Sequence, residues 1–416
     1  MKTKVIAGFS RLANSAVVLS LILGPVNGRT SSLATQAWGL NGSFGLGVSG
    51  ARNLMLTSCE NSEVVIAVID TGIDMAHPAL AKSLWVNNAE KNGKPGVDDD
   101  RNGFVDDVHG WDFVKKSGAL TDGHGHGTHI SGIISAQGSS PEEDFSGTCP
   151  GAKIMSLRYY DPNARGDENL INTVRAIDYA VKMNVDIINY SGGGNSFSSK
   201  EFEALKGAQG AGVLVVAAAG NETNQTDEKP YYPANYDLKN IISVAAINES
   251  GFKLSRSNYG VRTVHLAAPG QSILSTLPGG SYGFLSGTSQ ATAFVTGIAA
   301  IILTEAKNYL APKTKVEKVR LVREWIQEGT ESVATLKNMV STGGRASALK
   351  TIQLVQTRIG TAPKKDANTK NIQASNPVKE VRKDPRPASL ADSNELVTFS
   401  VRSLDTKKKN KRKRNL

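Results

Sequence analysis

The 416-residue sequence has few cysteines, few aromatic residues and, beyond its N-terminal region, no uncharged hydrophobic run of membrane-spanning length. Its two cysteines, Cys59 and Cys149, are too few for a disulfide framework or a cysteine-rich metal site. They can form one bridge in an oxidising compartment, or they can remain two unpaired thiols. Aromatic residues make up only 6% of the chain while glycine occurs 41 times, which indicates many tight turns and close backbone approaches.

The hydrophobic run that comes nearest to a membrane signal, Ala16–Leu23, is too short to span a bilayer comfortably. It lies within residues 1–28, follows the positive charges of Lys2, Lys4 and Arg11, and precedes small residues. This is the pattern of a secretory signal peptide, with a retained membrane anchor as the alternative. We therefore expect a soluble mature protein that is secreted or periplasmic.

Most of the chain carries no net charge. The net charge of +10 comes from 48 basic and 38 acidic residues, of which 16 and 6 lie in the segment 358–416. The remainder holds 48 − 16 = 32 basic and 38 − 6 = 32 acidic residues and is therefore neutral, so we expect no specific nucleic-acid partner. The segment 358–416 has too little apolar sequence to fold alone. We expect a basic, disordered tail that either contacts polyanions or is a solvated or processed end.

Short apolar runs alternate with helical patterns from Glu63 onward. The runs are Val64–Ile69, Ile154–Leu157, Val185–Ile188, Val213–Ala219 and Ile241–Ala246. Continuous runs of this length are typical of strands buried on both faces. Between them, Asp167–Met183 and Ser199–Gly210 show helical spacing, and Asp167 can cap the first of these helices. We therefore expect an α/β fold with a mostly parallel central sheet, helices on both faces, and a site at the carboxyl ends of the strands.

Polar residues suited to catalysis stand where these strands end. Asp70 directly follows the first run, and Asn221 follows the fourth. Either residue can serve a site or simply form a strand-end turn. Ser289 precedes a long Ala-rich apolar segment, which predicts a buried helix with Ser289 in its first turn. A serine there is either a nucleophile or an ordinary helix cap.

Three histidines, His124, His126 and His129, fall within six residues. One interpretation is a metal cluster, because the spacing resembles the metal-binding pattern of metallo-β-lactamase-like hydrolases. Thr128 stands where that pattern requires an aspartate, which counts against the metal. The other interpretation makes one of the histidines a general base.

Four short motifs in this chain resemble those of a known family. They are Asp70-Thr-Gly, His126-Gly-Thr-His, Ala219-Gly-Asn221 and Gly287-Thr-Ser289. These motifs are similar to the signatures of subtilisin-like serine proteases, the subtilase family, and stand in the family's order along the chain. The resemblance covers roughly residues 36–355. It implies a subtilisin-like three-layer α/β fold, with a peptidase domain that we place at 29–357, and a secreted serine endopeptidase.

The resemblance also implies a role for each catalytic candidate. Ser289 would attack the scissile carbonyl, His126 would serve as the general base, and Asp70 would orient His126 and stabilise its charged form. Asn221 would donate its side-chain amide to the oxyanion. His129 would be structural, and the purpose of His124 stays open.

The substrate segment of the family has a counterpart in Ser191, Gly192 and Gly193. The resemblance implies that this segment pairs with an extended peptide. Gly192 stands where the family often has a bulkier apolar residue, so we expect a wider neighbouring subsite. Tyr231 either reaches the floor of the primary specificity pocket or faces solvent.

A candidate calcium loop lies in the acidic stretch 98–107. Its candidate ligands, spaced as at the start of an EF-hand loop, are Asp98, Asp100, Asn102 and Asp106. His109 stands at the twelfth position, where an EF-hand has a bidentate glutamate, so a true EF-hand is not expected. Some subtilases carry structural calcium in similar insertions, and a solvated acidic turn is the alternative.

The chain departs from the family pattern in ways that leave the catalytic groups in place. Gln290 stands where methionine is common and Ala293 where proline is common. Between residues 28 and 36 there is no room for an N-terminal propeptide of domain size, so the chain either folds unaided or is assisted by another segment.

A catalytically inactive subtilase-fold binding protein and a three-histidine metallohydrolase are the alternative functions. We expect a monomer that acts on protein or peptide substrates.

Overall fold

The computed structural model describes residues 32–138, 145–165 and 167–360. The predicted signal peptide at 1–28 and nearly all of the predicted basic tail at 358–416 lie outside these ranges. The helices are α1 (Leu33–Gln36), α2 (Trp38–Asn41), α3 (Val48–Leu54), α4 (Asn88–Asn92), α5 (His126–Ser135), α6 (Glu168–Lys182), α7 (Ser199–Ala211), α8 (Thr288–Glu305), α9 (Lys307–Leu310), α10 (Lys315–Glu328) and α11 (Ala348–Ile359). The strands are β1 (Val65–Asp70), β2 (Gly110–Asp112), β3 (Lys153–Arg158), β4 (Ile187–Tyr190), β5 (Leu214–Ala218), β6 (Ile241–Ile247), β7 (Leu266–Pro269), β8 (Ile273–Leu277), β9 (Ser281–Leu285), β10 (Glu331–Ser332) and β11 (Gly344–Arg345).

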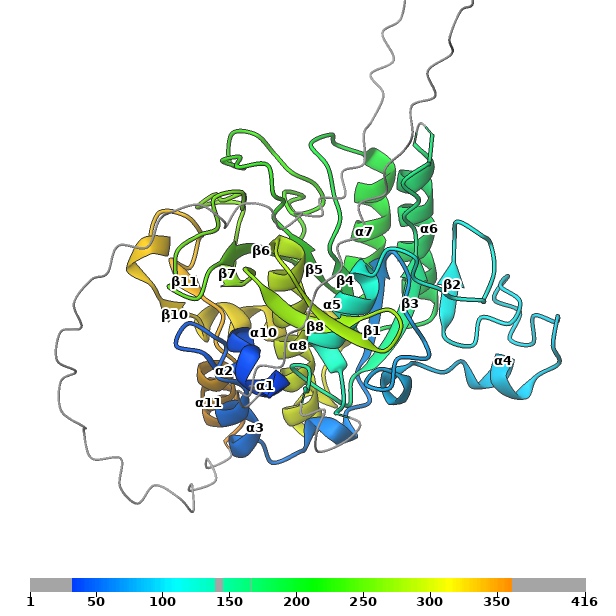
Figure 1. Cartoon of the computed structure of the whole chain (residues 1–416), viewed down its shortest axis with the longest axis horizontal. Coiled ribbons are helices and arrows are strands. Elements are labelled where there is room, and N and C mark those ends of the chain that lie inside the picture. The colour runs from blue at the N-terminus through cyan, green and yellow to red at the C-terminus, as the bar shows by residue number, and fades with distance from the viewer. Residues whose placement is uncertain (1–31, 139–144, 166, 361–416) are drawn as a thin grey trace, which may run out of the picture. The chain divides into compact units, whose positions relative to one another are not determined.

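Nine of these strands form one sheet in the order β10-β11-β7-β6-β5-β4-β1-β3-β2 (Figure 1). Neighbouring strands are parallel throughout except for the pair β10 and β11. The strands β8 and β9 form a separate antiparallel hairpin. Because β1, β4 and β5 are adjacent and parallel, the segments that follow them leave the sheet at the same edge.

Helices cover both faces of the sheet, because alternate residues of a strand point to opposite sides. In β1, Ile66 and Val68 join an apolar cluster that includes buried residues of α5, α8, α10 and α11. Ala67 and Ile69 of the same strand join a second cluster with buried residues of α6 and α7. The three layers confirm the α/β class and the subtilisin-like architecture that the sequence predicted.

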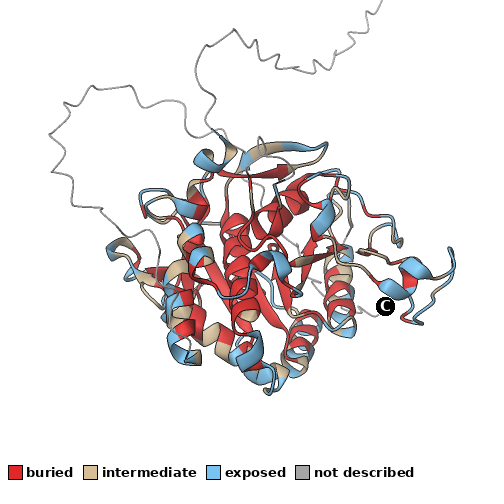
Figure 2. Ribbon diagram, turned by 90° about the horizontal axis from the view of Figure 1, so that it is seen from below, coloured by how far each residue is buried: buried red, intermediate tan, exposed pale blue. Residues whose placement is uncertain are grey.

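The helix α8 is the centre of the first cluster, and Figure 2 shows buried residues concentrated in the sheet and the helices against it. Of its 18 residues, 17 are buried, and it contacts β4, β5, β6 and β7 as well as α5, α9, α10 and α11. At Gly297 the helix also meets the segment between α5 and β3, where an added Cβ would overlap Thr148. Within the part of the chain that the structure describes, no helix is long and apolar enough to cross a membrane.

The five predicted strands correspond to β1, β3, β4, β5 and β6, and the three predicted helices to α6, α7 and α8. Asp167 occupies the position before α6, but its side chain makes no capping hydrogen bond, so the capping role predicted for it is wrong. The sequence did not indicate the short strands β2, β7, β10 and β11 or the hairpin of β8 and β9. Strands of two or three residues are too short for a periodic pattern, and β9 is half exposed.

The structure joins Cys59 to Cys149 in a disulfide. Cys59 begins a short 3-10 helix before β1, and Cys149 lies in the segment between α5 and β3. The bridge spans 90 residues, for which the chain-entropy model gives a stabilisation of roughly 4–5 kcal/mol. Of the two states left open by the sequence, the structure therefore has the bridged one.

Candidate active site

Asp70 and His126 meet at the carboxyl edge of the sheet. Asp70 is the last residue of β1 and His126 the first of α5, and they are 3% and 1% exposed. Oδ1 of Asp70 lies 2.7 Å from Nδ1 of His126 and also accepts the backbone N–H of Thr71 at 2.8 Å. The carboxylate can only accept here, so His126 carries a proton on Nδ1, which makes Nε2 the nitrogen able to take up another.

The approach of α5 to β1 depends on Gly127, the residue after His126. A Cβ at this position would overlap the carbonyl oxygen of Gly72 and lie 3.2 Å from the Cβ of Asp70. The backbone N–H of Gly127 donates to Oγ1 of Thr71 at 2.9 Å. A side chain at position 127 would therefore push His126 away from Asp70.

Asp122 holds the turn that leads into α5, a role that the sequence analysis missed. Its Oδ1 accepts hydrogen bonds from Thr71 Oγ1 and from the backbone of His124 and Gly125, and its Oδ2 accepts from the backbone and hydroxyl of Thr128. Burial opposes ionisation of Asp122, but these hydrogen bonds outweigh it and lower the pKa of the carboxyl below its ordinary value. An aspartate a few residues before a helix start was the available signal.

Ser289 lies in the first turn of α8, as the sequence predicted, and is 3% exposed. Its hydroxyl donates to the carbonyl oxygen of Ser191 at 3.1 Å. Ser191 follows the end of β4, so this contact joins the candidate nucleophile to the segment predicted to bind substrate. The first backbone N–H groups of a helix have no partner within the helix, and they give this end of α8 a partial positive charge.

Asn221 follows β5 and is 4% exposed. Its Oδ1 accepts the backbone N–H of Thr288 at 3.0 Å and the Thr288 hydroxyl at 3.2 Å. A backbone N–H can only donate, so the amide oxygen must face Thr288 and the amide nitrogen must face the other way. Thr288, a residue to which the sequence analysis gave no role, therefore orients Nδ2 of Asn221 as a donor beside the start of α8.

The candidate substrate segment, Ser191 to Gly193, continues from β4 past Ser289. Next to it, Gly194 exchanges two backbone hydrogen bonds with Tyr232, at 2.8 and 2.7 Å. A Cβ at Gly192 would overlap the hydroxyl of Tyr159, which is 1% exposed. The room left by the missing side chain is thus already filled, so the wider subsite expected at Gly192 is wrong.

The three clustered histidines have separate environments. His129 is fully buried, and its Nε2 lies 3.0 Å from the carbonyl oxygen of Ile273 and 3.2 Å from that of Gly283. The ring of His124 lies 6.4 Å from that of His126, centroid to centroid. Burial and the neighbouring His126 lower the pKa of His124. His129 therefore anchors the hairpin of β8 and β9, which fits a structural role and leaves no three-histidine metal arrangement.

Because two of its histidines are buried, we expect the protein to lose stability in acid. Burial is the main cause that lowers the pKa of His129 to about 3 and that of His265 to about 4, and nearby Arg323 adds to the effect on His265. Below the ordinary histidine pKa of 6.5, the unfolded chain binds protons that the folded chain does not. The free energy of unfolding is therefore highest above pH 6.5 and falls as the pH is lowered toward 4. Each histidine contributes a slope of up to about 1.4 kcal/mol per pH unit.

The measurement is urea unfolding of Ser289→Ala protein, which avoids autolysis, at pH 7.5, 6 and 5. His265→Asn protein should show a shallower dependence of the unfolding free energy on pH. An unfolding free energy that stays constant from pH 7.5 to pH 5 would contradict the prediction.

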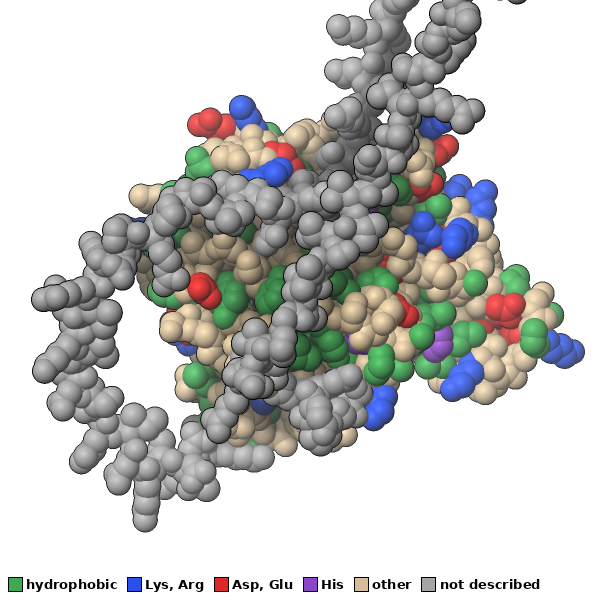
Figure 3. Space-filling view, viewed as in Figure 1, with side chains coloured by type: hydrophobic (Ala, Val, Ile, Leu, Met, Phe, Trp, Pro, Cys, Tyr) green, Lys and Arg blue, Asp and Glu red, His purple; other side chains and the backbone are tan. Residues whose placement is uncertain are grey.

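The acidic loop places the candidate calcium ligands differently from the sequence pattern. Asp98 and Asp100 gather with Glu90 of α4, with oxygens within 4.8 Å of one another, and this is the one such group of acidic, histidine or cysteine residues in the described ranges. Asp106 instead accepts the backbone N–H of Gly96, and Asn102 Oδ1 accepts that of Phe104. Figure 3 shows acidic side chains on the projection that carries α4. The sequence pattern missed Glu90 because it lies outside the loop.

The sequence model of the subtilase family matches residues 61–353. The chain belongs to the subtilase family. The matched range includes the four candidate site residues, Asp70, His126, Asn221 and Ser289. This is a family of serine endopeptidases, and its members commonly bind structural calcium.

Curated subtilases of quite different size resemble this chain. It is 32% identical over 318 residues to "Subtilisin-like protease 1" of Plasmodium berghei (strain Anka), covering 72% of this chain and 51% of that protein. It is 35% identical over 249 residues to "Thermitase" of Thermoactinomyces vulgaris, covering 60% of this chain and 78% of that protein. The chain thus spans about half the length of the Plasmodium relative, whereas its match to thermitase covers 78% of that protein.

Proposed function

We propose that the protein is a secreted serine endopeptidase that cleaves peptide bonds with Asp70, His126 and Ser289. The observation that carries the proposal is the 2.7 Å bond between buried Asp70 and His126, at the sheet edge where Ser289 lies in the first turn of α8. This bond fixes the tautomer of His126 that a general base requires. Subtilase membership supports the same reaction class.

The reaction begins with the Ser289 hydroxyl, whose proton passes to Nε2 of His126 as its oxygen attacks the scissile carbonyl carbon. The imidazolium so formed is stabilised by the carboxylate of Asp70 and then protonates the leaving amine. Asn221 Nδ2 and the backbone N–H of Ser289 donate to the negatively charged oxygen of the intermediate. Water then attacks the acyl-enzyme, with His126 again taking the proton, and releases the acid product.

A fluorophosphonate probe tests this proposal directly, since it reacts with an activated serine. Wild-type protein should be labelled at Ser289, as located by mass spectrometry, and Ser289→Ala protein should not. Failure to label correctly folded wild-type protein would support the alternative, an inactive subtilase-fold binding protein.

We also propose that residues 1–28 are a signal peptide and that the protein is exported as a monomer. The disulfide between Cys59 and Cys149 supports export, since such bonds persist in oxidising compartments. N-terminal sequencing of protein recovered outside the producing cell tests the cleavage site.

We further propose that the basic segment 358–416 contacts polyanions. Salt-dependent binding of a polyanion, measured before and after removal of that segment, tests this proposal.

For calcium, we propose a structural site at Glu90, Asp98 and Asp100. Carboxylate oxygens are the ligands that Ca²⁺ prefers, and three negative charges so close together are stabilised by a cation. Adding calcium in excess over a chelator should raise the melting temperature of Ser289→Ala protein by several degrees, as ligand binding to the folded state does. Asp98→Asn should abolish the shift, while Asp106→Asn, whose carboxylate faces Gly96, should keep it. A melting temperature indifferent to calcium would refute the site.

A further inference from the structure

The space beside the candidate nucleophile is bounded by two chain segments. One is Ser191 to Gly194, which follows β4 and bonds to Ser289 through the carbonyl oxygen of Ser191. The other is Ala219 to Asn221, which follows β5 and ends in the candidate oxyanion donor. Since β4 and β5 are parallel neighbours that pair Tyr190 with Ala217, the two segments leave the sheet side by side.

A substrate carbonyl attacked by Ser289 has its oxygen directed at Asn221 Nδ2 and the N–H of Ser289. Because Ser289 contacts Ser191 of the first segment and Asn221 ends the second, the residue that carries this carbonyl, the acyl-side residue, lies next to both segments. The gap between them is therefore the space into which its side chain must go.

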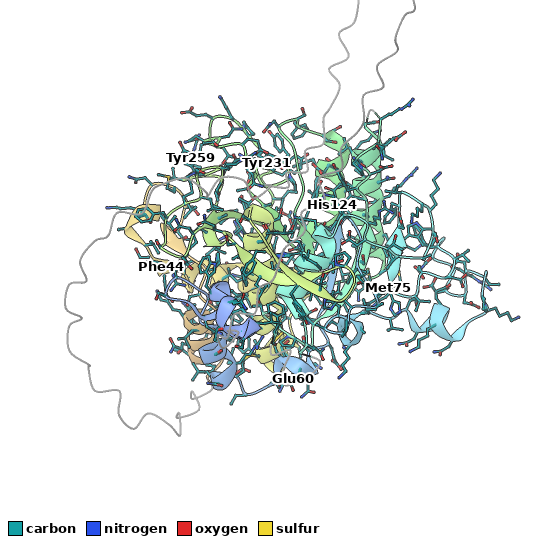
Figure 4. The ribbon with its side chains drawn as sticks, viewed as in Figure 1. Phe44, Glu60, Met75, His124, Tyr231 and Tyr259 are labelled. Carbon is teal, nitrogen blue, oxygen red and sulfur yellow. A yellow bond between two sulfur atoms is a disulfide. The ribbon has the colours of Figure 1, made fainter. Side chains whose placement is uncertain are left out.

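The ring of Tyr231 occupies this gap. A Cβ at Gly193 would lie 2.6 Å from Cε1 and 3.0 Å from Cζ of Tyr231, and a Cβ at Gly220 would lie 2.9 Å from its Cδ2. One edge of the ring thus meets the first segment and the other edge meets the second. Tyr231 is only 2% exposed, and Figure 4 shows it toward the same upper side of the domain as His124, which precedes α5.

The backbone around Tyr231 is held on both sides. Its N–H donates to Asn235 Oδ1 at 3.2 Å, and its carbonyl oxygen accepts the N–H of Asn235 at 2.9 Å. The next residue, Tyr232, exchanges two backbone hydrogen bonds with Gly194. Removing the ring from the gap would therefore require its main chain to move or the ring to leave a buried position, and both are costly.

We infer that Tyr231 closes the specificity pocket and restricts the acyl-side residue of the substrate to small side chains such as glycine, alanine and serine. This inference rests on the proposed endopeptidase function and adds to it the class of bond that is cut. A phenylalanine or leucine side chain has to compete with the Tyr231 ring for the same volume. Pocket size alone gives discrimination of tens to hundreds of fold per misfitting group, so we expect at least about 100-fold here.

The test uses two peptide substrates that differ only in an alanine or a phenylalanine at the acyl-side position. Wild-type enzyme should cleave the alanine peptide with a kcat/KM at least about 100-fold higher. In Tyr231→Ala enzyme the ratio of the two kcat/KM values should shift toward phenylalanine by about 100-fold. In Tyr231→Phe enzyme, which keeps the ring and loses only the hydroxyl, the ratio should stay as in the wild type. Because each ratio is taken on one preparation, the fraction of active enzyme cancels.

A wild-type enzyme that prefers phenylalanine would overturn the inference, and so would an unchanged ratio in Tyr231→Ala enzyme. If Tyr231→Ala protein does not fold, wild-type enzyme alone decides the matter through inhibition by peptide aldehydes that end in alanine or phenylalanine. Fluorophosphonate labelling separates this result from the proposed function. Labelled enzyme that prefers large residues refutes the inference alone, whereas folded protein without labelling refutes both.

Discussion

Replacing Ser289 with alanine should lower kcat for peptide hydrolysis by about six orders of magnitude, the loss measured for the equivalent change in subtilisin. The variant keeps the bond between Asp70 and His126 but has no atom to form the acyl-enzyme. The residual rate would come from the oxyanion donors and from substrate binding alone. Initial rates with a fluorogenic peptide at saturating concentration measure the effect.

Ser286→Ala is the matched control for this experiment. Ser286 lies three residues before Ser289, and its hydroxyl accepts the backbone N–H of Ser272 at 2.8 Å. We expect the control to retain a kcat near that of the wild type. Substantial hydrolysis by purified Ser289→Ala protein would show that another group performs the chemistry.

Replacing Asp70 with asparagine should lower kcat by about four orders of magnitude near neutral pH, as in serine proteases that use the same three residues. An amide retains the size of the carboxylate but lacks its charge, so it neither fixes the Nδ1-protonated tautomer of His126 nor stabilises the imidazolium. The two buried side chains would still be in contact, so the loss should fall on kcat more than on KM. Full kinetics across pH 6 to 10 measure it.

Asp74→Asn is the control, since Asp74 is a second aspartate only four residues after Asp70. Its carboxylate accepts backbone N–H groups of Ala76 and Gly279 and so orders a loop. We expect its kcat to stay within about tenfold of the wild type. Equal losses in the two variants would mean that Asp70 acts through the fold rather than through His126.

The parts of the molecule that a local pattern could predict were those built from contiguous residues. The buried strands β1 and β5 are uninterrupted apolar runs, and α8 follows an Ala-rich segment, so each was visible in sequence. The catalytic roles of the residues at their ends rested on the four motifs and remain predictions. In the structure these residues do gather at one edge of the sheet.

The parts that escaped prediction depend on residues far apart in the chain. Nothing near Gly192 indicated that Tyr159 fills the adjoining space, and nothing near Asp98 indicated Glu90 as its neighbour. For Tyr231 the sequence left two positions open, and contact with Gly193 and Gly220 decided between them. Such contacts are set by packing between elements, which a local sequence pattern does not encode.

The burial of α8 links the candidate nucleophile, Ser289, to the global stability of the fold. A helix that contacts four strands and four other helices opens only when the sheet itself opens, so its amide hydrogens should be among the slowest to exchange with solvent. The nucleophile would then have no locally unfolded state of its own. On heating, the protein should keep a fully formed site until it unfolds cooperatively, rather than pass through intermediates of gradually weakening activity.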